Sequence, residues 1–67
     1  MKPEAVFGTN AGKVWLALKS KGQLSAEALS KATKLKLHEV YGALGWLGRE
    51  GKIEIVNEKQ TTLYKLL

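Results

Sequence analysis

One amphipathic segment, residues 37–53 (LHEVYGALGWLGREGKI), constrains the fold more than any other part of the chain. At 100° per residue its apolar side chains fall within an arc of about 100°, the pattern of a helix with one buried face. Gly51 then suits the left-handed turn that ends many helices, and an alternating strand pattern follows directly. We therefore predict a helix that runs straight into a strand. The residues expected on its buried face are Leu37, Val40, Tyr41, Leu44, Leu47 and Gly48.

The opposite side of this helix has an unusual composition for a surface in water. It combines a tryptophan with glycines, each of which costs a helix about 1 kcal/mol relative to alanine. A large aromatic beside small residues suits the close approach of another protein chain. Trp46 therefore has three open interpretations: cover within the chain, an intermolecular contact, or a contact with DNA. The residues expected on this side are His38, Glu39, Gly42, Gly45, Trp46 and Arg49.

Length and composition exclude several classes of protein. The 67 residues suffice for one domain, and the absence of cysteine excludes disulfides and thiolate metal sites. No apolar run approaches the ~20 residues that span a membrane, and no signal-peptide pattern follows Met1. We expect a complete cytoplasmic protein with no membrane attachment, no cofactor and no small-molecule ligand.

The N-terminal third predicts a tail and one helix. Residues 1–9 are expected to be an irregular tail, because Pro3 and Gly8 oppose regular structure. Asn10 is a plausible N-cap, since its side chain can accept a hydrogen bond from a free backbone N–H. The helix is expected over residues 11–20.

The flanking elements complete the pattern. Ser25 is the expected N-cap of a helix over residues 26–33, preceded by a short strand at 23–24. Beyond the central helix, residues 52–56 and 61–66 alternate like strands around a polar turn, which predicts a β-hairpin.

This order of elements resembles a winged helix-turn-helix domain. The run QLSAEALSKATKLKLHEVYGALGWLGREGKIE carries the resemblance, through Leu24, Ser25, Val40, Leu44, Leu47, Gly51 and Ile53. The AGKVW and ALGWL runs are similar to a small prokaryotic winged-helix family of unassigned function. The resemblance implies an α+β winged helix-turn-helix fold over residues 10–67, with three helices, a two-stranded C-terminal wing and a short first strand. It implies DNA binding by analogy.

Two positions depart from the usual pattern of DNA-binding members. Lys36 stands where a serine or threonine usually caps the third helix, and Lys34 stands where the turn usually carries a glycine. A left-handed residue other than glycine costs on the order of 1 kcal/mol. Both changes preserve the fold and add positive charge beside the central helix.

The positive charge lies mainly in the first half of the chain. Net charge is +5, and residues 1–36 hold seven lysines against two glutamates, whereas residues 37–67 are neutral. Lysines around the turn are candidates to clamp phosphates, although a solvated surface explains them equally well. The candidate nucleic-acid-binding residues are Lys31, Lys34, Lys36, His38, Arg49 and Lys59.

Several apolar residues have no evident place in a small three-helix core, and they predict a homodimer. A specific pair of subunits ordinarily buries about 800 Å² on each partner. The candidate interface residues are Val6, Phe7, Leu16, Gly42, Gly45 and Trp46.

Two functions follow as hypotheses, and neither is enzymatic. His38 is the only histidine and has no partner at metal-ligand or catalytic spacing. The leading hypothesis is a transcription regulator or chromosome-associated protein that binds double-stranded DNA mainly through phosphates, with weak sequence preference. The alternative is a protein-interaction or homodimerisation module that uses its third helix without binding DNA.

Overall fold

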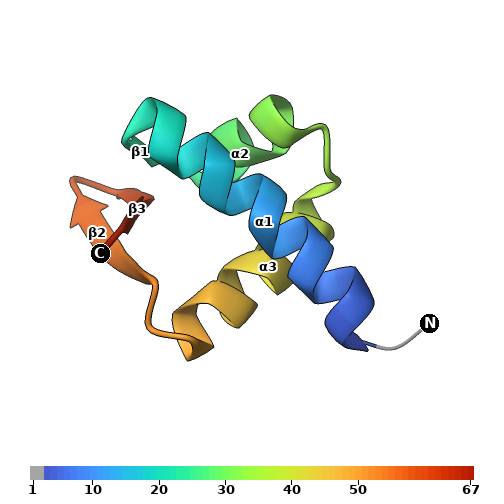
Figure 1. Ribbon diagram of the computed structural model, residues 1–67. Coiled ribbons are helices and arrows are strands. Elements are labelled where there is room, and N and C mark those ends of the chain that lie inside the picture. Colours follow the sequence, from blue (N-terminus) through green and yellow to red (C-terminus); the bar gives the residue numbers. More distant parts are fainter. Residues whose placement is uncertain (1–2) are drawn as a thin grey trace.

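Three helices and a small antiparallel sheet make up the part of the chain that the computed structural model describes, residues 3–67, with side chains from residue 8 onward (Figure 1). The sheet has the strand order β1-β3-β2, so β2 lies at one edge. The predicted α+β winged-helix architecture is confirmed. In chain order the elements are α1 (Pro3–Lys21), β1 (Gln23–Leu24), α2 (Ala26–Thr33), α3 (Leu37–Arg49), β2 (Ile53–Glu58) and β3 (Thr61–Leu66).

The core forms where α1 crosses α3, with α2 and the sheet closing its other sides (Figure 1). The largest fully buried side chains are Val14 and Leu18 of α1, Leu29 of α2 and Val40 of α3. Fully burying an aliphatic side chain of this kind contributes about 1.5–3 kcal/mol. The sheet packs on this cluster through Leu24, Ile53, Tyr64 and Leu66.

The first helix is longer than the sequence predicts. It begins at Pro3, so residues 3–9 continue the helix and the predicted irregular tail is wrong for them. A proline is well tolerated in the first turn of a helix, where its missing N–H has no partner to lose. Asn10 is correspondingly 9% exposed inside the helix, and it is not the N-cap.

The buried face of α3 is rotated relative to the prediction. Val40, Leu44 and Leu47 are buried as expected, but Leu37 and Tyr41 are 40% and 50% exposed. Gly48 is also exposed, while Ala43 and the half-buried Trp46 take part in the packing. The Trp46 side of α3 faces α1, where Gly8, Ala11, Gly12 and Trp15 line a hollow together with Trp46.

The helix ends and turns follow the predicted chemistry. The Ser25 side chain accepts a hydrogen bond from the Ala28 N–H at 3.1 Å and caps α2. Gly51 closes α3 with a φ of 70°. The hairpin turn is tighter than predicted, because β2 extends to Glu58 and leaves only residues 59–60 between the strands.

Two glycine substitutions test this account of the backbone. Gly12 lies inside α1, where a Cβ would meet no heavy atom within 4 Å, so Gly12→Ala should stabilise the fold by about 0.5–1 kcal/mol.

Gly22 has a φ of +93°, so Gly22→Ala should destabilise the fold by about 1 kcal/mol. Urea unfolding followed by circular dichroism measures both, and a loss of stability in Gly12→Ala would contradict the described packing of α1.

Candidate nucleic-acid interface

The solvent-facing side of α3 is the surface that a helix-turn-helix protein presents to the major groove. Arg49 is the residue type there that most commonly reads guanine, but it lies in the last turn of the helix. The rest of the surface is mainly apolar or lacks a side chain, so it offers little for direct base reading. Its exposed residues are Leu37, His38, Tyr41, Gly45, Gly48 and Arg49.

A short, internally bonded turn joins α2 to α3. Leu35 is buried at its centre and anchors the turn on the core. The Ser30 hydroxyl donates to the Leu35 carbonyl at 2.6 Å, and the Leu35 N–H donates to Thr33 Oγ1 at 3.3 Å. These bonds fix the backbone from which the neighbouring lysines project.

The structure brings three of the predicted phosphate-binding lysines together around this turn. Lys31 lies in the last turn of α2, Lys34 takes the left-handed conformation with a φ of 62°, and Lys36 is the N-cap of α3. The Glu39 carboxylate accepts the Lys36 backbone N–H at 2.9 Å and forms no ion pair with these lysines among the described residues. All three lysines are exposed. The ion pairs among the described residues lie elsewhere, at Lys52–Glu50 and Lys65–Glu54.

Of the other predicted contacts, Lys59 and Arg49 lie apart from this turn, whereas His38 follows it closely. Lys59 occupies the tip of the β2–β3 hairpin, where its backbone has a φ of 44°. His38 is exposed in the first turn of α3, whereas Arg49 is exposed in its last turn. The predicted residues therefore form one cluster of lysines around the turn, with Arg49 and Lys59 as separate positive charges and His38 beside the cluster.

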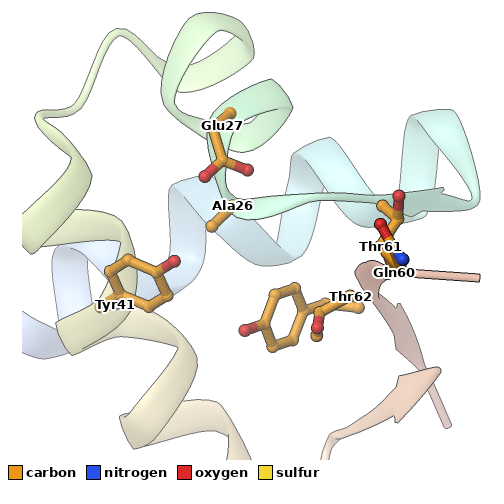
Figure 2. Close-up of a pocket in the computed structure, with 7 residues that line it drawn as sticks. Ala26, Glu27, Tyr41, Gln60, Thr61 and Thr62 are labelled. Carbon is orange, nitrogen blue, oxygen red and sulfur yellow. The ribbon is translucent and has the colours of Figure 1, made fainter. Parts of the chain in front are cut away.

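A pocket of about 330 Å³ lies between α2, α3 and the hairpin (Figure 2). In Figure 2 the Glu27 carboxylate points from α2 toward the space beside Tyr41. Burial raises the pKa of Tyr64, and nearby Tyr41 and Glu27 raise it further. The sequence analysis missed this pocket, because its residues lie far apart in the chain. They are Ala26, Glu27, Tyr41, Gln60, Thr61, Thr62 and Tyr64.

A second hollow, about 540 Å³, runs between α3 and β2 and is called the α3–β2 groove below. Gly45 and Gly48 leave it open on the helix side, since a Cβ at either position would meet no heavy atom within 4 Å. Ile55 borders the groove from β2 and is 62% exposed, which the sequence analysis did not anticipate. The lining residues are Tyr41, Leu44, Gly45, Gly48, Ile53, Glu54, Ile55 and Tyr64.

The residues predicted to form an interface do not share one surface. Trp46 is half-buried against the core and, with Trp15, lines a hollow of about 230 Å³ between α1 and α3. Gly42 is also partly buried, so placing these two residues on the water-facing side was wrong. Leu16 is 62% exposed on α1, and Gly45 is exposed in the α3–β2 groove. The side chains of Val6 and Phe7 lie outside the described residues.

Neither a metal centre nor a membrane span is found in the described part of the chain. No group of three or more His, Cys, Asp or Glu residues there could hold a metal ion. Across residues 3–67, no helix is both long and apolar enough to cross a bilayer.

A helix-turn-helix pair followed by a two-stranded hairpin, built on a three-helix core, defines the winged helix-turn-helix class. The chain belongs to the family of winged helix-turn-helix domains known as DUF2582, whose model matches residues 1–66. Among solved structures, protein BT2368 from Bacteroides thetaiotaomicron, determined by solution NMR, is 31% identical with a TM-score of 0.90. The match covers 97% of this chain and 79% of that one. No curated protein matches the chain.

A truncation at Trp46 tests whether its ring supports the fold. Because the ring packs against the core between α1 and α3, Trp46→Ala should lower the free energy of unfolding by about 2–3 kcal/mol. Leu16→Ala is the matched control on the exposed side of α1, and it should change stability by less than about 0.5 kcal/mol. Chemical unfolding of both variants gives the comparison, and equal stabilities would contradict the placement of Trp46.

Proposed function

We propose that this protein binds double-stranded DNA chiefly through phosphate contacts, as a small transcription regulator or chromosome-associated protein of the cytoplasm. The observation that carries the proposal is the rigid α2–α3 turn, which holds Lys31, Lys34 and Lys36 exposed and free of ion pairs. Lysines placed beside the reading helix fix a protein on a duplex without reading its sequence. Lys59 at the hairpin tip adds a further charge that suits a phosphate contact.

Sequence preference is expected to be weak. Side chains that discriminate between bases are mostly arginine, lysine, asparagine and glutamine aimed into the major groove. The exposed side of α3 offers Arg49 in its last turn and His38 in its first, with apolar residues and glycines between them. Affinity therefore comes from the charge on the phosphates, and it is expected to depend steeply on salt.

A specific observation favours a second candidate function, protein binding through α3. The α3–β2 groove is open, is lined mainly by apolar residues and glycines, and includes the exposed Tyr41 and Ile55. Apolar surface that stays exposed beside a helix commonly marks a protein interaction site. This function needs no DNA contact, and the two candidates predict different responses to salt.

Removing the turn lysines tests DNA binding. If Lys34 and Lys36 each neutralise one phosphate, the double substitution to glutamine should reduce the log–log slope of affinity against salt by about 1.8. The matched control replaces Lys13 and Lys21, which are exposed on α1, by glutamine and removes the same charge. A fluorescence anisotropy titration of a labelled duplex at several salt concentrations measures the slopes.

Two results of this titration would count against the proposal. Equal loss of binding in both double variants would assign the affinity to net charge alone and remove the role of the turn. A protein that fails to bind duplex DNA near about 50 mM salt at tens of micromolar would overturn DNA binding itself.

A further inference from the structure

The outer edge of the sheet is formed by β2. β2 is an edge strand of six residues, and no other strand of the described chain pairs with its outer side. Such an edge presents backbone N–H and C=O groups that can pair with another strand. Ile55, at the middle of this edge, is also among the most exposed large apolar residues of the described chain.

The hydrogen-bond pattern shows which residues of β2 direct their backbone groups outward. The Leu67 N–H donates to the Lys52 carbonyl at 3.0 Å, which places positions 52 and 67 in the hydrogen-bonded phase of the ladder, while the Lys52 N–H donates to the Leu47 carbonyl. Bonded and non-bonded pairs alternate along an antiparallel ladder. The bonded pairs that follow on β2 therefore fall at positions 54, 56 and 58, opposite β3. The residues with outward-facing N–H and C=O groups are Ile53, Ile55 and Asn57.

These outward groups restrict how a second copy of β2 can pair with the first. In a two-fold antiparallel pair, hydrogen bonds form only where outward-facing residues oppose one another. Centring the pair on Ile55 satisfies this condition, because Ile55 then faces its own copy and Ile53 faces Asn57 of the second copy. Each of the three residues then gives and receives one hydrogen bond.

The charges on β2 and on Lys52, which directly precedes the strand, favour this register over its neighbours. With Ile55 at the centre, Lys52 lies directly opposite Glu58 of the second copy, and symmetry repeats this pair at the other end. Moving the centre to position 54 places Glu54 against its own copy. Moving it to position 56 places Glu54 against Glu58. Opposite charges facing each other across strands stabilise a pair, and like charges destabilise it.

We propose that two copies of this chain form a homodimer by antiparallel pairing of β2 with β2, centred on Ile55, so that the sheet continues across both subunits. A two-fold axis perpendicular to the sheet keeps the Ile55 faces of both strands on the same side. That side is the one facing the α3–β2 groove, because Ile53 and Ile55 line it. Ile55 of each copy then covers the open side of the groove of the other.

This dimer rests on the second candidate function, protein binding through α3, and names a second copy of the chain as the partner. It does not depend on DNA binding. The groove borders the C-terminal half of α3, at Gly45 and Gly48, whereas the lysines of the α2–α3 turn lie at its N-terminal end. The two proposals can therefore fail separately. A dimer that binds no DNA would contradict the proposed DNA binding alone, and a monomer that binds DNA would contradict the dimer alone.

A single cysteine at the centre of the strand pair tests the register. The chain has no cysteine, so Ile55→Cys introduces one thiol per subunit. Residues in a hydrogen-bonded antiparallel pair have Cα atoms about 5.5 Å apart, within the range that a disulfide bridges. In a glutathione redox buffer most of the Ile55→Cys protein should become a disulfide-linked dimer, measured by non-reducing electrophoresis, with circular dichroism confirming the fold.

Asn57→Cys is the matched control on the same strand and the same face. In this register position 57 faces position 53, so two cysteines at position 57 lie about four residues apart along the strand and beyond disulfide reach. The control protein should therefore form no disulfide-linked dimer under the same conditions, although its subunits still pair through β2. Equal cross-linking of both variants, or of neither, would overturn the proposed pairing.

Exchanging the charges at positions 52 and 58 tests the pairing without introducing a cysteine. Lys52→Glu should weaken dimerisation roughly tenfold in sedimentation equilibrium, because two like-charged pairs replace two opposite ones. Adding Glu58→Lys to the same chain should restore the affinity of the original protein. An original protein that is monomeric at about 0.5 mM, far above the Kd of specific dimers, would overturn the dimer itself. A double variant as weak as the single one would overturn the register.

Discussion

The packing of α1 across α3 is the interaction on which the rest of this structure depends. A domain of this size buries only about 60% of the surface of its unfolded chain, so its stability rests on a few completely buried side chains. Val14 and Leu18 of α1 meet the α3 side at Val40, and Leu29 closes the cluster from α2. Because α3 is held against α1, the C-terminal end of α3 sets where β2 begins. The side of α3 that faces away from α1 is left exposed to solvent.

The sequence predicted the elements well because their signals are local. Ser25 as an N-cap and Gly51 as a helix end each depend on chemistry within a few residues, and both are confirmed. The rotation of α3 was not predictable in the same way, because it depends on how α1 packs across it. Local periodicity left open whether Trp46 is covered within the chain, and the structure shows that it packs against the core beside α1. The candidate lysines were found because they cluster in sequence, whereas the α3–β2 groove joins residues from two elements and appears only in three dimensions.

The lysines of the α2–α3 turn and the α3–β2 groove lie toward opposite ends of α3, and this arrangement organises the two candidate functions. Positive charge gathers at its N-terminal end, where the buried Leu35 makes the turn rigid. Gly45 and Gly48 lie toward its C-terminal end, and the exposed Ile55 lies across the groove from them on the edge strand β2. The proposed phosphate contacts use the α2–α3 turn, and the proposed protein contacts use the α3–β2 groove and the edge of β2. The two proposed functions therefore do not compete for the same atoms. The glycines that weaken α3 as a helix are explained in this account by the space they leave for a partner.

Amide hydrogen exchange along β2 tests most directly whether this edge is an interface. The Val56 N–H bonds to β3 within the chain, whereas the Ile55 N–H points outward and is protected only by a partner strand. At about 0.5 mM protein we expect the Ile55 amide to exchange slowly, as Val56 does, and dilution should make Ile55 exchange fast while Val56 stays protected. An Ile55 amide that exchanges at the rate of an unprotected group at every concentration, beside a protected Val56, would contradict the proposed pairing of β2.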